Sequence, residues 1–154
     1  MTDDTKTVRW WFWAIAILFL LLNFVACWGY WLEMTLTDEA YSKAYGAEMA
    51  ALRGKTPAWS ISAYAVGVWG GLIGTVLLLL RKKQCLPFFY ASFAGAIIGW
   101  SWNIIDVRFR DLMGAAGWGF MIFIWLECLF IIWFARRMRA EAYCAKQHLS
   151  HSWL

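Results

Sequence analysis

Charged residues are scarce in this chain of 154 residues, of which only 16% are Asp, Glu, Lys or Arg. An average soluble domain carries about 25%. Apolar residues make up 62% of the chain and its mean hydropathy is +0.54, more apolar surface than a water-soluble core of this size can bury. The same numbers exclude disordered, collagen-like and disulfide-rich secreted proteins. The composition predicts an integral membrane protein with a single domain, residues 1–154.

Several chemical groups are missing from the apolar part of the chain. Both histidines lie near the C-terminus, so a bis-histidine haem within the bundle is excluded. No lysine lies in mid-membrane, so covalent retinal has no attachment point. The chain has no P-loop, GxSxG or HExxH motif, which gives no support to hydrolase or NTPase activity. We therefore expect a protein that is not an enzyme, and the sequence leaves any cofactor unknown.

Long apolar runs are what the chain does have. They cover residues 10–32, 57–80, 86–105 and 115–135, and each reaches the ~20 residues that a helix needs to cross the hydrocarbon core. The two prolines, Pro57 and Pro87, lie in first turns, where a missing N–H costs little. The sequence predicts an all-α bundle of four transmembrane helices.

The distribution of Lys and Arg predicts the orientation of this bundle. The N-terminal tail, the connection at 81–83 and the tail at 136–154 carry more of them than the first loop and the connection at 107–114. The positive-inside rule then places both termini in the cytoplasm. The first run is too long for a signal peptide and lacks an A-x-A site, so we expect a retained anchor. These membrane-flanking cations account for the net charge of +4 and indicate no nucleic-acid partner.

The first loop has a helical pattern of its own. Thr37 is a good N-cap, and two acids follow it in the first turn. Apolar residues then recur at helical spacing as a stripe of Tyr41, Tyr45, Met49 and Leu52. We predict one short amphipathic helix over 37–53, on the outer membrane surface or over the mouth of the bundle.

Three segments within residues 34–87 carry a resemblance to a known group of proteins. They are Met34-Thr35, Pro57-Ala58-Trp59, and the sequence VWGGLIG at 68–74 followed by LLLLRK at 77–82. In these segments the chain resembles small four-helix bacterial inner-membrane proteins that often carry the automatic label "sugar transporter". The resemblance implies a bacterial inner-membrane location and transport, and it carries over no catalytic residue.

Glu127 is the outstanding polar residue of the predicted spans. It lies ~10 residues into the fourth span, hence ~15 Å deep and near the midplane. A bare carboxylate is costly there, so it should be protonated or paired across the bundle. Counting along the other spans places Asn23, Gly67 and Gly95 at the same level. Two interpretations stay open: Glu127 bonds Asn23 and holds helices together, or it is a functional ionisable site.

Small residues in the second and third spans indicate close helix packing. They form small-x3-small patterns, which let two helix backbones approach each other, within one chain or between chains. The candidates are Gly67, Gly70, Gly71, Gly74, Gly95 and Gly99.

A polar stripe follows the third span and ought to face the bundle interior. It comprises Ser92, Gly95, Gly99, Asn103 and Asp106. Together with Glu33 and Ser60, this stripe is a candidate lining for an outward vestibule, framed by Trp100, Trp102 and Trp118. Most of the 13 tryptophans are better explained as interfacial belts.

The cysteines predict no disulfide, because two lie in spans and two on the predicted cytoplasmic side. Cys144, His148 and His151 share one face of a possible cytoplasmic helix. They are weak candidates for a metal site because a fourth ligand is missing. We favour a solvated tail and expect no metal.

Two functions from different classes fit these features. The first is an accessory or interaction subunit, or a bundle that binds a lipid or pigment. The second is an oligomeric transporter of small, sugar-like solutes, or a proton-coupled one, with Glu127 as its ionisable site. The expected partners are membrane lipids, with further copies of the chain or a larger membrane complex.

Overall fold

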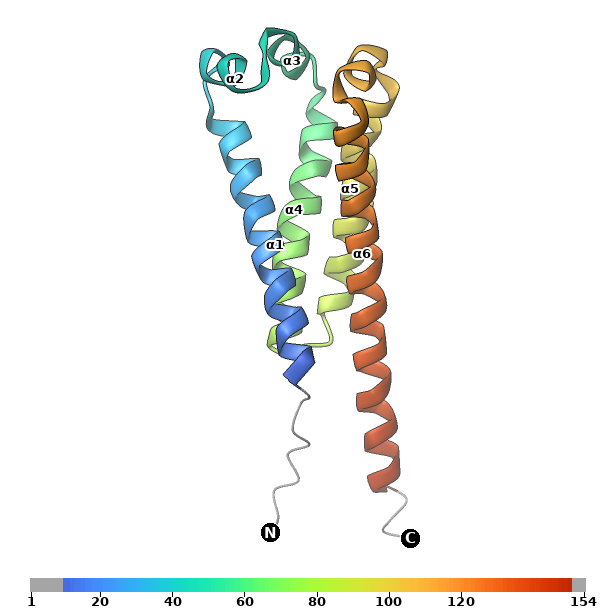
Figure 1. Cartoon of the computed structure of the whole chain (residues 1–154). Helices are drawn as coiled ribbons and strands as arrows, with labels where there is room; N and C mark the ends of the chain where they lie inside the picture. Colours follow the sequence, from blue (N-terminus) through green and yellow to red (C-terminus); the bar gives the residue numbers. More distant parts are fainter. Residues whose placement is uncertain (1–9, 151–154) are drawn as a thin grey trace.

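In a computed structural model, residues 10–150 are described, and their side chains up to Met138. All regular structure in this part of the chain is helical, and it contains no strand (Figure 1). Six helices follow one another: α1 (Trp10–Thr35), α2 (Asp38–Tyr45), α3 (Ala47–Arg53), α4 (Ala58–Leu79), α5 (Cys85–Ile105) and α6 (Val107–Ser150).

Four helices are long and apolar enough to cross a membrane, which confirms the predicted set of four spans. They are Trp10–Thr35, Ala58–Leu79, Cys85–Ile105 and Val107–Met138. Large apolar side chains cover their outer surface, as Leu21 (58% exposed), Phe24 (60%) and Leu126 (61%) illustrate. Such a surface is stable only when lipid covers it, so the chain is a multi-pass membrane protein.

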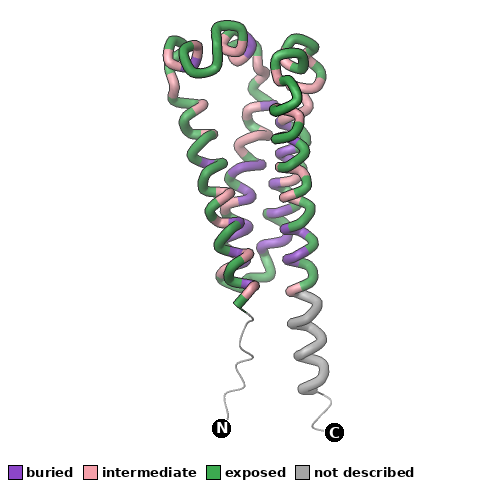
Figure 2. Tube along the Cα trace, viewed as in Figure 1, coloured by how far each residue is buried: buried purple, intermediate pink, exposed green. Residues whose placement is uncertain are grey.

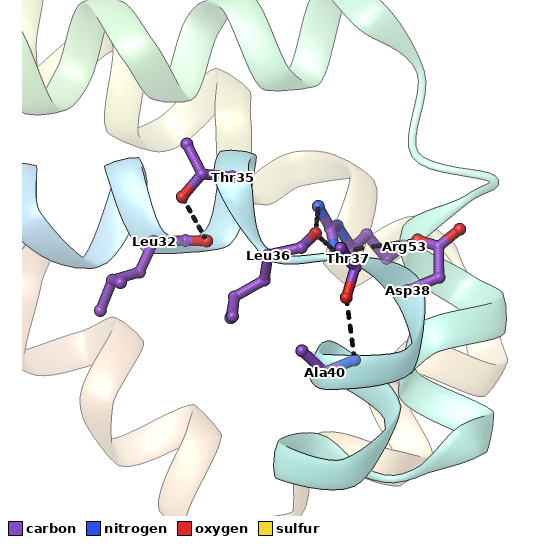
Figure 3. A network of polar contacts seen from close by, with 7 residues as sticks. All are labelled: Leu32, Thr35, Leu36, Thr37, Asp38, Ala40 and Arg53. Carbon is purple, nitrogen blue, oxygen red and sulfur yellow. Dashed lines mark hydrogen bonds and ion pairs between the residues drawn. The ribbon is translucent and has the colours of Figure 1, made fainter.

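The predicted helix over 37–53 is interrupted, and the structure has two short helices there instead. Thr37 caps α2 as expected, since its Oγ1 accepts a hydrogen bond from the Ala40 N–H at 3.3 Å (Figure 3). The break falls at Gly46, whose φ of 93° leaves the helical region. Glycine adopts this conformation without the steric cost that a Cβ would add, so the chain turns between α2 and α3.

Two further connections bend at residues with positive φ. Gly114, with φ 57° and ψ −172°, breaks α6 between a first segment of about two turns and its long apolar part. Arg81, also at φ 57°, follows α4. There the Arg81 N–H bonds Leu78 O at 2.9 Å and the Lys82 N–H bonds Leu77 O at 2.8 Å. This is the Schellman pattern that closes helix C-termini.

The helices pack in a definite order, with α4 in the middle. It packs along α5 on one side and against α1 on the other, and α6 packs on α5. The helices α1 and α6 meet through aromatic rings: Phe12 and Phe134 stack at 5.8 Å between centroids, as do Phe19 and Phe130. The buried hydrophobic side chains of α1 and α6 gather at these contacts with Leu86 and Phe89 of α5, and further buried residues run along α4 and α5 (Figure 2). Towards α2 and α3 the ribbons of α1 and α6 stand further apart (Figure 1).

Glycines allow the close approach of α4 and α5. A Cβ added at Gly95 would lie 2.6 Å from both Ala63 O and Gly67 N, and one at Gly99 would lie 2.9 Å from Tyr64 N. These neighbours are backbone atoms, so they have little freedom to yield. The small-residue faces of α4 and α5 therefore meet within one chain.

Candidate functional site: a cavity among the spanning helices

A cavity of about 470 Å³ lies among the four spanning helices, with α2 at one end of it. Its wall is mostly apolar and includes residues of α1, α4, α5 and α6. At the end of the cavity that lies away from α2, Phe19 lines the wall and stacks on Phe130. Val25 on α1 and Phe120 on α6 also line it and are 66% and 58% exposed. The cavity therefore communicates with the outer surface of the spanning helices.

Glu127 of α6 lies in this wall beside Phe123 and Ile124. It is half-buried, and among the described residues it forms no hydrogen bond or ion pair. An acid without a partner is expensive in an apolar environment. A group that remains in such a place is a candidate for contact with a ligand.

Asn23 lines the same cavity but does not bond Glu127. Its Nδ2 donates to Phe19 O at 2.9 Å within α1 and to Thr75 Oγ1 at 3.4 Å on α4. Thr75, which is fully buried, donates in turn to Gly71 O at 2.8 Å. The amide thus joins α1 to α4, and the Asn23–Glu127 bond considered from the sequence is not formed.

Of the four residues placed at one level by counting, the structure brings three to the cavity: Asn23, Gly67 and Glu127. The fourth, Gly95, packs on the backbone of α4. Gly67 O accepts a hydrogen bond from Ser92 Oγ at 2.5 Å, which ties α5 to α4 at the cavity wall.

Glycines also make room at this wall. A Cβ at Gly71 would collide with Asn23 Oδ1 and approach Ser92 Oγ to 3.1 Å, so its absence leaves space for two polar groups. The other two glycines of α4 face α5: a Cβ at Gly70 would lie 3.4 Å from Phe88 O, and one at Gly74 2.7 Å from the Phe89 ring.

Tyrosines surround the end of the cavity next to α2. Tyr41, Tyr45 and Tyr64 line it together with Glu33, and the ring of Tyr64 lies edge-on to Tyr30 at 5.3 Å. Burial, and to a lesser degree the negative charge of Glu33, raises the pKa of Tyr41 above its ordinary value. Its hydroxyl is therefore a neutral hydrogen-bonding group at physiological pH.

Arg53 of α3 holds this end of the molecule together. Its two terminal nitrogens each donate to Leu36 O at 3.2 Å, and Nη1 lies 3.9 Å from Asp38 Oδ1 (Figure 3). Its Cζ sits 4.6 Å from the centre of the Tyr41 ring, a cation–π contact. The guanidinium fixes the α2–α3 segment to the end of α1, above the cavity.

The structure brings only part of the predicted vestibule lining to the cavity. Ser60 is buried and donates to Gly99 O at 2.8 Å, so it connects α4 with α5. Asp106 Oδ1 accepts from the Arg108 N–H at 2.9 Å and caps the start of α6. Asn103, Trp102 and Trp118 do not line the cavity within the described part of the chain, whereas Glu33, Ser92 and Trp100 do.

Among the residues whose side chains the structure describes, no three His, Cys, Asp or Glu residues lie close enough together to hold a metal ion. The weak candidates Cys144, His148 and His151 lie outside those residues.

Sequence reasoning missed the three tyrosines as cavity residues. Tyr41 and Tyr45 were assigned only to an amphipathic stripe, and Tyr64 has no polar neighbour in sequence to draw attention to it. Tyr30 and Tyr64 both lie near the end of a span that adjoins the first loop, but Tyr90 lies near the opposite end of α5, so the placement of tyrosine alone does not predict the cavity.

Comparisons with protein-family models, with curated proteins and with solved structures give no match. The resemblance noted in residues 34–87 therefore stays a prediction.

Proposed function

We propose that this protein binds an apolar or amphiphilic molecule of the membrane in the cavity among its four spans. The observation that carries the proposal is the cavity itself, about 470 Å³ with a mostly apolar wall. Ligand sites in proteins typically measure ~300–1,000 Å³ and combine an apolar lining with a few polar groups. The chain would then act as a binding or accessory protein of the membrane and not as an enzyme.

The exposure of the wall supports a ligand that comes from the bilayer. The cavity residues Val25 and Phe120 are largely exposed on helix surfaces that face lipid. An acyl, isoprenoid or aromatic chain can enter from that side without crossing water. Transfer into the cavity exchanges one apolar environment for another, so affinity has to come from fit and from the few polar contacts.

We infer that the α2 end of the cavity lies outside the cytoplasm, in the bacterial inner membrane that the resemblance of residues 34–87 implies. The start of α1 and the end of α6 lie on the same side of the molecule (Figure 1). The sequence has its excess of Lys and Arg on that side, including Arg81, Lys82 and Lys83, and the positive-inside rule makes it cytoplasmic.

One observation favours the transporter as a second candidate. Glu127 lies in the cavity wall without a hydrogen bond to any described residue, as a carboxyl that exchanges a proton or an ion would. Four helices rarely enclose a complete path, so this function would require two or more copies of the chain. In that case Glu127→Gln abolishes proton-dependent uptake into vesicles.

The test of binding is to purify the protein in mild detergent and identify bound small molecules by mass spectrometry. Gly29 offers a variant that fills the cavity without disturbing the fold, because it lines the cavity and a Cβ there meets no atom within 4 Å. Gly119 is the matched control, equally open but not part of the wall.

We expect the wild type and Gly119→Leu to retain the same molecule at a constant ratio to protein, and Gly29→Leu to lose it. Only bulk lipid in variable amounts in all three proteins would contradict the proposal. A protein partner that co-purifies equally with all three would favour an accessory role that does not involve the cavity.

A further inference from the structure

The ionisable carboxyl groups in the cavity wall have no basic residue beside them in that wall. Glu33 and Glu127 line it, and none of the described lining residues is Lys, Arg or His. A carboxylate or phosphate group placed against this wall would find no basic side chain in it to balance the negative charge, which is unfavourable in a low-dielectric environment. The cavity therefore discriminates against anionic ligands.

Glu33 and Glu127 differ in whether a positively charged side chain lies near them. Arg53 is held in place by Leu36 and Asp38, and it lies against the ring of Tyr41, which lines the same end of the cavity as Glu33. Glu127 has no basic neighbour on the cavity wall and no hydrogen bond within the described part of the chain. Glu127 is therefore the acid of the cavity wall that lacks a positively charged partner among the described residues.

Aromatic rings line the same space. Phe123 and Phe120 lie on α6 about one and about two turns from Glu127, respectively, and Trp100 lines the cavity from α5. Ring faces attract cations, and the attraction is larger where water is excluded. An apolar wall, aromatic rings and one uncompensated carboxyl together fit one class of molecule.

We propose that the ligand of the cavity is an amphiphilic cation, with an apolar body against the aromatic and aliphatic wall and a positively charged group balanced by Glu127. This inference rests on the proposed function and adds the charge of the ligand to it. Pairing with a cation offsets the cost of a carboxylate in the membrane, which gives Glu127 a physical reason to be there.

Tetraphenylphosphonium and tetraphenylborate are suitable probes, because they share size and shape and differ in the sign of their charge. Their binding to the purified full-length protein is measured by equilibrium dialysis in dodecyl maltoside. We expect saturable binding of the phosphonium and none of the borate. Glu127→Gln should weaken phosphonium binding by at least about tenfold, as loss of one partner of a buried charge pair does.

Glu48→Gln is the matched control, since Glu48 is an exposed acid of α3 outside the cavity wall; it should bind the phosphonium as the wild type does. Equal binding of both ions, with loss of both in Gly29→Leu, would overturn the charge inference and leave the proposed function standing. No saturable phosphonium binding, or an unchanged affinity in Glu127→Gln, would also overturn it. The wild-type comparison of the two ions needs no variant to fold.

Discussion

At the scale of the residue, Glu127 and Asn23 show how two polar groups of one cavity differ in role. Asn23 is bonded across the bundle to Thr75, so it contributes to the fold. Glu127 lies in the wall without a hydrogen bond to a described residue, so removing its charge takes away no observed contact. We therefore infer that the Asn23 amide stabilises the fold and that the Glu127 carboxyl binds the ligand.

The two roles predict opposite effects of removing each polar group. Glu127→Leu should leave the free energy of unfolding unchanged or raise it, because an unpartnered carboxyl is costly in apolar surroundings. Asn23→Leu should lower it by about 1 kcal/mol, since Thr75 loses an interhelical bond. Both are measured as thermal stability in detergent. A Glu127→Leu variant that is less stable than Asn23→Leu would contradict this division of roles.

Counting residues along the predicted spans located Glu127 and Asn23 at similar depth, because a helix rises by a fixed ~1.5 Å per residue. The direction of each side chain is set by how the helices are rotated about their axes, which depends on packing. The bond from Asn23 to Thr75 links residues 52 positions apart in the chain, and nothing in the local pattern distinguishes it from a bond to Glu127.

At the scale of the element, the pairing of α4 with α5 is the contact that positions the cavity wall. Ser92 bonds Gly67 O and Ser60 bonds Gly99 O across this interface. The glycines let the two backbones come close enough for these bonds. Displacing the helices would break both bonds and move Ser92 and Gly67, which line the cavity.

One methyl group at this interface should therefore be enough to disturb it. In Gly95→Ala the new Cβ would lie 2.6 Å from Ala63 O and Gly67 N, and we expect a loss of about 1–3 kcal/mol in unfolding free energy. Gly119→Ala, with no atom within 4 Å of its Cβ, should be as stable as the wild type or more so. Equal melting temperatures for both variants would show that α4 and α5 pack differently.

The existence of the four long helices could be predicted from hydropathy, because each apolar run has to satisfy its backbone within one segment in lipid. The break in the first loop was missed because the apolar stripe at Tyr41, Tyr45, Met49 and Leu52 continues through it. Gly46 tolerates both helical and positive φ values. In the structure Gly46 has a φ of 93°. That turn goes together with a tertiary contact, the hydrogen bond from Arg53 of α3 to Leu36 O, which the local sequence pattern does not reveal.

At the scale of the whole molecule, the cavity lies where α1 and α6, which touch through aromatic rings at one end, stand further apart towards the α2–α3 segment (Figure 1). Stacked rings of Phe19 and Phe130 close the first end, and Tyr41 and Tyr45 lie at the second. Such a space could not be predicted from the sequence, since it results from the angle between helices that are not neighbours in the chain.

The orientation of the molecule gives a prediction at this scale. In a background without the four native cysteines, Ser42→Cys in α2 should react with a membrane-impermeant maleimide added to whole cells. Gln84→Cys, at the opposite end before α5, should react only after the cells are opened, because the flanking cations keep that end in the cytoplasm. Labelling of position 84 in intact cells would reverse the orientation.

The central claim, that a discrete molecule occupies the cavity in the membrane, is tested most directly by photo-cross-linking in living cells. Phe123 lines the cavity and its neighbour Ile122 does not, although both are about half exposed (52% and 51%). Replacing each in turn by p-benzoylphenylalanine and irradiating the cells samples the two surroundings. We expect one adduct of defined mass at position 123 and only the range of bulk phospholipid masses at 122. The same range of lipid masses at both positions would contradict the claim.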